Sequence, residues 1–279
     1  MPIGPARMPL LEHLGELRMR LTRIVVVLLV ATCVFYFATP TVMQIMTWPI
    51  QDVLEAYGIE ALAVLDPFEG FGVRFLVSIW TGVVATMPVI IWQLLAFFLP
   101  ALKPKERKWF IPTFIAAVCL FMAGTIFCYT LILNPAFQWL MDQAGEFATV
   151  MARAETYIDI IIKFELGFGL AFELPLIVFY LVIFNIVPYK KLRGAWRGVY
   201  VGLLVLSAMV TPDASPVTMG LMFAAMVVLY EFSLLLARII LRKRIKKQEE
   251  EDDEDSAELL KQSMEAEPKG GLFAKKKSE

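Results

Sequence analysis

Chemically versatile side chains are scarce in this chain of 279 residues. It has one histidine, His13, and three cysteines, Cys33, Cys119 and Cys128, which all lie inside hydrophobic runs. An odd number of cysteines in such runs is not typical of a disulfide framework. The spacing His13-x-x-Glu16 suits a pair of metal ligands, but typical zinc sites use three or four, and no further histidine or cysteine lies nearby. We therefore expect no metal, no cofactor and, because most acid–base schemes need histidine, no enzyme.

Long apolar runs dominate instead. Hydrophobic residues make up 58% of the chain, and the mean hydropathy is +0.66. Soluble domains are nearer half apolar and lack repeated runs of bilayer length. We predict an all-α, polytopic membrane protein with six transmembrane helices, of which the last two are short because a crossing usually needs about 20 residues. The predicted spans are 22–39, 73–100, 109–133, 157–187, 197–211 and 217–237.

Basic residues fall almost only in alternate gaps between these spans. The gaps 40–72 and 211–216 contain no lysine or arginine, and the gap 134–156 contains only Arg153. By the positive-inside rule both termini are cytoplasmic. We predict a cytoplasmic segment 1–21 with an interfacial helix, a membrane domain 22–240 and a charged, disordered tail 241–279. The cytoplasmic basic residues are Arg7, Arg18, Arg20 and Arg23; Lys103, Lys105, Arg107 and Lys108; Lys190, Lys191, Arg193 and Arg197; and Arg238, Arg242, Lys243 and Arg244.

Two carboxylates stand out on the predicted cytoplasmic side. Glu16 lies away from the leucine face of the interfacial helix, where it either pairs with Arg20 at i,i+4 or receives an external cation. Glu106 lies in the basic stretch 103–108, where it is either neutralised by its neighbours or acts as a second acceptor. Carboxylates match the planar donors of guanidinium groups. The pair therefore suits a partner that carries two arginines.

Glu173 lies near the middle of the fourth span, just before Pro175. A carboxylate at that depth is costly and points to a function, although a protonated glutamate bonded to a neighbouring helix is the structural alternative. A proton-coupled small-solute transporter that uses Glu173 is the second functional candidate, but we detect no internal repeat. We interpret Gly167 and Gly169 in the same span as helix-packing residues.

Five motifs, in one order between about residues 10 and 240, resemble the TatC family, the large multispan subunit of the twin-arginine protein translocase. They are His13-Leu-Gly-Glu-Leu-Arg18 with Arg20-Leu21, Pro67-Phe-Glu-Gly-Phe71, Gln93 followed by Phe97-Phe-Leu-Pro-Ala-Leu102 and then Glu106-Arg107, Phe168-Gly-Leu-Ala-Phe-Glu-Leu-Pro175, and Leu229-Tyr-Glu-Phe-Ser233 with Arg238.

The resemblance implies a receptor for twin-arginine signal peptides and the core scaffold of a translocase that exports folded proteins across the inner membrane. Transport would be driven by the proton-motive force, without nucleotide. The implied signal-peptide residues are Glu16, Arg18 and Glu106, and the implied intramembrane functional residues are Glu173, facing a concave pocket, and Pro175. Self-association and contact with lipid, but not with nucleic acid, are also expected.

Small single-span subunits, TatA and TatB, would dock near the fifth span. The implied docking residues are Glu165, Met209 and Thr211. The segment Thr211-Pro-Asp-Ala-Ser-Pro216 departs from the family's usual Thr-Pro-Pro-Asp, since one proline and a following glutamine are absent. Any partner contact at this loop would therefore differ from that of other members.

The charged tail gives a first prediction. The protein truncated after Lys247 should export folded cargo as efficiently as the full-length protein. The residues that the truncation removes are mostly polar and cannot form a packed core. The measurement is export of a folded reporter that carries a twin-arginine signal peptide. Loss of export by the truncated chain, at equal membrane abundance, would show that the tail is needed.

Overall fold

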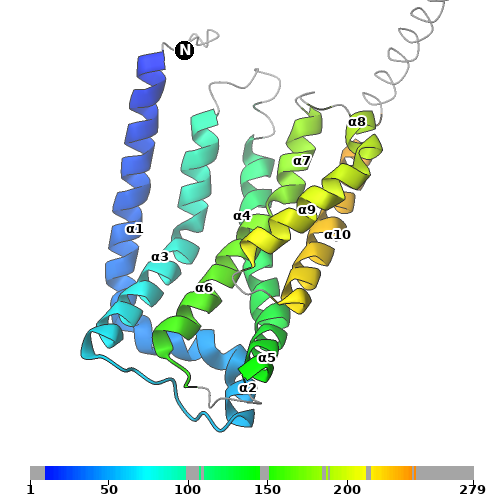
Figure 1. Cartoon of the computed structure of the whole chain (residues 1–279). Coiled ribbons are helices and arrows are strands. Elements are labelled where there is room, and N and C mark those ends of the chain that lie inside the picture. Colours follow the sequence, from blue (N-terminus) through cyan, green and yellow to red (C-terminus); the bar gives the residue numbers. More distant parts are fainter. Residues whose placement is uncertain are drawn as a thin grey trace, which may run out of the picture.

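A computed structural model describes residues 10–98, 107, 110–144, 151–183, 187, 189–211, 215–240 and 242. Helices form most of this part of the chain (Figure 1). They are α1 (Leu10–Thr47), the short 3-10 helix η1 (Trp48–Ile50), α2 (Gln51–Ala56), α3 (Pro67–Phe98), α4 (Phe110–Phe127), the π-helical turn η4 (Cys128–Ile132), α5 (Leu133–Ala144), α6 (Ala154–Ala171), α7 (Leu174–Ile183), α8 (Tyr189–Gly194), α9 (Trp196–Val210) and α10 (Pro216–Ile240).

The predicted all-α membrane fold is confirmed. Five helical stretches are long and apolar enough to cross a bilayer: Glu12–Ala56, Pro67–Phe97, Phe110–Gln143, Ala154–Val182 and Pro216–Ile239. The predicted fifth span is the shorter apolar helix α9, which has 15 residues. α10 has 25 residues and is longer than the predicted range 217–237. α1 is continuous, so the predicted N-terminal helix and the first span form one rod.

The helices run up and down between two ends (Figure 1). The start of α1, the end of α3, the start of α4, helix α8 and the end of α10 all lie at one end. These segments carry basic residues in the sequence, such as Arg18 in α1, Arg193 in α8 and Arg238 in the last turn of α10. We call this the basic end. Helix α2, the end of α5 and the start of α6 lie at the other, distal end. The alternation of charge along the sequence thus becomes a separation in space.

At the distal end the loop before α3 is fastened to the segment before α6. Ala63 and Arg153 form a short parallel bridge, in which the Ala63 amide donates to the carbonyl of Ala152 at 2.8 Å. The buried carboxylate of Glu69 accepts from Arg153 Nε at 2.9 Å and from the Leu65 amide at 2.9 Å. The hydrogen bond from Arg153 to Glu69 also raises the pKa of the guanidinium. This pair explains the single basic residue of the gap 134–156.

Helices α1 and α3 lie side by side along most of their length. Small polar residues line their contact: Thr39 Oγ1 lies 3.0 Å from Ser78 Oγ, and a Cβ on Gly82 would lie 3.2 Å from Thr32 Oγ1. Small residues let membrane helices approach closely. The other faces of α1 expose large apolar side chains, such as Phe37 at 86% exposure, which suits contact with lipid.

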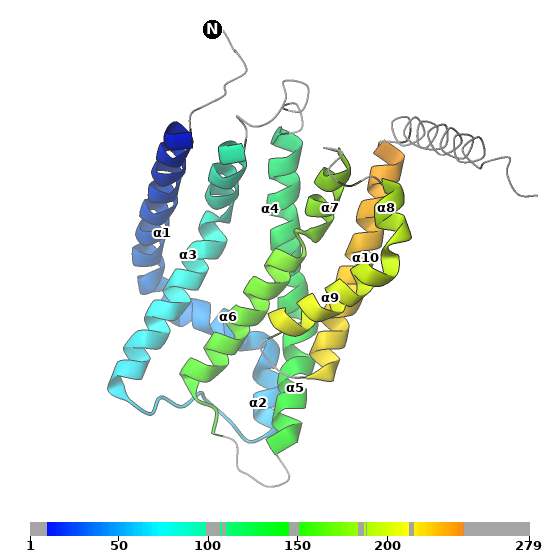
Figure 2. The ribbon, with the colours of Figure 1, turned by 45° about the horizontal axis from the view of Figure 1, so that its top comes forward.

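Helix α6 crosses its neighbours at glycines (Figures 1 and 2). A Cβ on Gly124 of α4 would lie 2.6 Å from the Phe168 carbonyl oxygen. A Cβ on Gly167 would lie 2.4 Å from Val210 Cγ1 at the end of α9, and one on Gly169 would meet Phe121 of α4 at 2.7 Å. The predicted helix-packing role of Gly167 and Gly169 is therefore confirmed.

These contacts predict the effect of one added methyl group. Gly124→Ala should destabilise the protein by about 1–3 kcal/mol, because the backbone of α6 cannot move aside as a flexible side chain would. The matched control is Gly220→Ala on α10, where a Cβ meets nothing within 4 Å. Thermal unfolding in detergent should show a lower midpoint for Gly124→Ala only. Equal midpoints for the two variants would contradict the close crossing.

Candidate functional site

At the basic end, Glu16 is held between α1 and α3. Its Oε1 accepts from Arg20 Nε at 3.0 Å and also from Arg20 Nη2. Arg20 Nη1 reaches across to Gln93 Oε1 of α3 at 3.4 Å. The ring of His13 stacks on Phe97 of α3, with centroids 4.2 Å apart. Two turns of α1 are thus attached to the last turns of α3, which positions the carboxylate.

Only half of this carboxylate is used. Glu16 Oε2 is buried and has no hydrogen-bond partner among the described residues. His13 Nδ1 is 3.9 Å away, too far for a hydrogen bond. Buried oxygens are normally satisfied, so one without a donor is a natural place for an incoming N–H group. The internal pair with Arg20 that the spacing predicted is present, and it leaves the second acceptor free.

The other residues predicted at this end are placed differently. Arg18 is exposed, and its backbone carbonyl accepts from the Thr22 hydroxyl at 2.8 Å. Glu106 lies outside the described residues, whereas its neighbour Arg107 is described. Arg107 Nε is buried and has no partner in the described part of the chain. The roles of Arg18 and Glu106 stay predictions.

Sequence reasoning placed Gln93 and Phe97 in a motif but assigned them no role. The structure shows that they anchor Arg20 and His13. Their spacing of four residues, which puts both side chains on one face of α3, is the signal that points to such a contact surface. It does not say which helix lies opposite.

Glu173 lies in the short break between α6 and α7. Pro175 has no amide hydrogen and so cannot continue the hydrogen bonds of α6, while the Leu176 and Ile177 amides restart the helix on the Glu173 carbonyl at 3.0 and 3.1 Å. Glu173 is half-buried, and its Oε1 is buried without a partner among the described residues. The bond to a neighbouring helix proposed as the structural alternative is therefore not seen at this oxygen. The concave pocket beside Glu173 stays a prediction.

The three predicted docking residues do not share a surface. Glu165 is 5% exposed, and its Oε2 accepts from the indole Nε1 of Trp80 on α3 at 2.5 Å. Thr211 is buried, and its hydroxyl donates to the Ser207 carbonyl at 2.9 Å. Met209 is 78% exposed. Of the three, only Met209 offers its side chain to a partner without rearrangement.

The family of Sec-independent protein translocase proteins (TatC) matches residues 12–224 of this chain. The chain belongs to the TatC family. Curated TatC relatives include those of Deinococcus radiodurans, 32% identical over 84% of this chain and 87% of the relative, and of Aquifex aeolicus, 31% identical over 85% of this chain and 98% of the relative. A crystal structure of a twin-arginine translocase receptor TatC superposes with a TM-score of 0.67 at 30% identity, over 81% of this chain and 98% of the other.

TatC membership makes the chain a multi-pass membrane component of the Sec-independent protein translocase of the inner membrane. TatC proteins are translocase components rather than enzymes, and the small-solute transporter alternative is not favoured. The family resemblance read from the five motifs is confirmed. The motif residues Glu16, Glu69 and Glu173 each occupy a defined structural position, at the basic end, the distal end and the α6–α7 break.

The Trp80–Glu165 contact predicts a structural role for both side chains. Trp80→Phe should lower stability by about 1–3 kcal/mol, because it leaves a buried carboxyl oxygen without a donor. The double variant Trp80→Phe with Glu165→Leu should recover part of the loss. Trp92→Phe on the same helix is the control, since Trp92 is 40% exposed and packs edge-on against the rings of Phe110 and Phe114. Equal unfolding midpoints for both single variants would show that the bond is unimportant.

Proposed function

We propose that this protein is the twin-arginine signal-peptide receptor and the core scaffold of a translocase that exports folded proteins, driven by the proton-motive force. The observation that carries the proposal is Glu16, a carboxylate held in place by α1 and α3 with one oxygen lacking a donor. In this proposal the basic end faces the cytoplasm, so both termini are cytoplasmic. The signal peptide of a folded cargo would then meet this end first.

The geometry supports recognition of guanidinium groups. Arg20 already binds Glu16 through two of its nitrogens, so the site accepts the planar fork of an arginine. A peptide arginine can use the second oxygen, Oε2, once the covered carboxylate rotates. We propose that Glu106, 90 positions further along the chain, binds the second arginine, and that the exposed Arg18, two residues from Glu16, also contacts the signal peptide.

The membrane interior supports the scaffold role. Single-span subunits of the TatA and TatB type are proposed to dock along α9, where Met209 is exposed and the helix is only 15 residues long. A short span thins the bilayer around it or needs support from neighbouring helices, and a partner helix would supply that support. We propose that Glu173, at the break between α6 and α7, responds to the proton-motive force. Association between copies of the chain is part of the same proposal.

The receptor proposal is tested by site-specific photo-crosslinking of a twin-arginine signal peptide in native membranes. We expect crosslinks at the N-terminal part of α1 and at 102–108. Glu16→Ala and Glu106→Ala should each weaken binding about tenfold or more, the usual loss for one charge-assisted hydrogen-bonded pair. Glu12→Ala is the matched control, because Glu12 is an exposed carboxylate one turn away on the same helix.

A second arm tests the chemistry of the site. A peptide with two lysines in place of the arginines should bind more weakly, since an ammonium group is a point charge without the planar fork. Equal binding of the two peptides would refute recognition by planar hydrogen bonding. No crosslink anywhere in the intact protein would refute the receptor proposal itself and favour a role for Glu173 in solute transport.

A further inference from the structure

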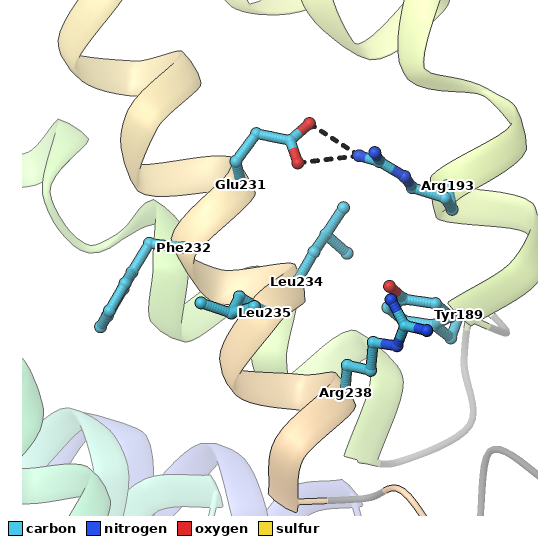
Figure 3. A pocket seen from close by; sticks show the side chains of 7 residues that line it. All are labelled: Tyr189, Arg193, Glu231, Phe232, Leu234, Leu235 and Arg238. Carbon is cyan, nitrogen blue, oxygen red and sulfur yellow. Dashed lines mark hydrogen bonds and ion pairs between the residues drawn. The ribbon is translucent and has the colours of Figure 1, made fainter.

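A second candidate site lies on the other side of the bundle, between α8 and α10, and its charged residues are mostly basic. A pocket of about 320 Å³ lies there. Figure 3 shows Arg193 and Tyr189 on one wall and Arg238 of α10 on the other. Leu234 and Leu235 of α10 line it between the polar groups. It lies at the basic end, where α8 sits beside the last turns of α10 (Figure 1). Nothing in the signal-peptide proposal uses this pocket.

The fold holds one of the two arginines firmly. Arg193 Nη1 donates to both oxygens of Glu231, at 2.9 and 2.8 Å, and the Tyr200 hydroxyl donates to the same carboxylate at 2.8 Å. The Tyr230 hydroxyl donates to the Leu192 carbonyl at 3.0 Å and so ties α8 to α10. Only one of the three guanidinium nitrogens of Arg193 is engaged in this way. The remaining donors can bind a ligand without disturbing the packing.

The charge in the pocket is unbalanced. Two guanidinium groups face a single carboxylate, Glu231, which is already shared by Arg193 and Tyr200. Arg238 makes no hydrogen bond or ion pair with any residue in the described ranges. A ligand that offers several anionic oxygens, such as a phosphate ester, complements two such forks.

A second, apolar groove lies beside this pocket and shares Phe232 with it. Phe232 lines both, and it projects from α10 on the side away from Arg193 (Figure 3). The groove, about 290 Å³, runs between α4, α7 and α10 past Leu176, Phe179 and Leu236. Its lining is almost wholly apolar. A ligand with an anionic head and a hydrocarbon chain would fill both spaces, whereas a free anion would leave the groove empty.

We propose that this site binds an anionic phospholipid, with its phosphate between Arg193 and Arg238 and one acyl chain over Phe232 into the groove. Basic pockets between membrane helices at the level of the headgroups suit such lipids. The site lies near the end of α10, where a helix long enough to span a membrane is followed by the basic residue Arg242, and we expect lipid phosphates at such a boundary. The proposal does not depend on signal-peptide recognition.

Native mass spectrometry of the full-length protein, released from detergent with added lipid, tests the proposal. Phosphatidylglycerol should be retained in preference to phosphatidylcholine with the same chains. Arg238→Gln should lower the apparent affinity for phosphatidylglycerol about fivefold, the usual effect of one basic residue at an anionic membrane surface. Arg197→Gln is the matched control, because Arg197 is exposed, lies over the ring of Trp196 and is not part of the pocket. It should leave the affinity unchanged.

Two further experiments distinguish lipid binding from the binding of a simple anion and from misfolding of a variant. Soluble glycerol phosphate should displace the lipid poorly, since it cannot fill the groove. Arg238→Lys should keep part of the affinity, because it retains the charge but loses the planar fork. Equal retention of both lipids, displacement by glycerol phosphate at equal concentration, or an equal loss in Arg197→Gln and Arg238→Gln would each overturn the proposal. If Arg238→Gln does not fold, Arg238→Lys compared with Arg197→Lys decides on the same criteria.

Discussion

The close approach of α6 to its neighbours holds the other elements in place. Inside a bilayer apolar surfaces gain little by leaving lipid, so helices associate through tight packing and hydrogen bonds. Here α6 meets α4 at Gly124 and Gly169, meets α9 at Gly167 and meets α3 through the Trp80–Glu165 bond. α1, which buries few of its side chains, is positioned mainly through α3. These contacts fix the positions of the helices that carry the two candidate sites at the basic end.

Much of this architecture could be predicted from the sequence. Bilayer thickness sets the length of an apolar run that can span the membrane, and the positive-inside rule predicts on which side each loop lies. The short fifth span and the packing glycines Gly167 and Gly169 are examples. The partners of individual polar residues could not be predicted. Trp80 and Glu165 are 85 positions apart, and no sequence pattern around either residue indicates that the other is its partner. The role of Gln93 beside Arg20 was missed for the same reason.

The basic end therefore combines two sites with different chemistry on opposite flanks of the bundle. On one flank a carboxylate with a spare oxygen, Glu16, is suited to incoming cations. On the other flank Arg193 and Arg238 are suited to anions. In both sites one part of a charged group is bonded to another residue of the protein, Arg20 for Glu16 and Glu231 for Arg193, and the remainder is left for a ligand. Net charge alone, at −1 for the whole chain, conceals this division.

The distal pair of Glu69 and Arg153 has a consequence for biogenesis. The two residues are 84 positions apart, so Glu69 leaves the ribosome long before its partner does. Until the third span, formed by α4, η4 and α5, has been inserted and the segment before α6 has reached the distal end, the Glu69 side chain has only local backbone donors, such as the Leu65 amide. The loop before α3 can reach its final form only then. Closure of the distal end therefore requires that the first three spans have been inserted in the correct order.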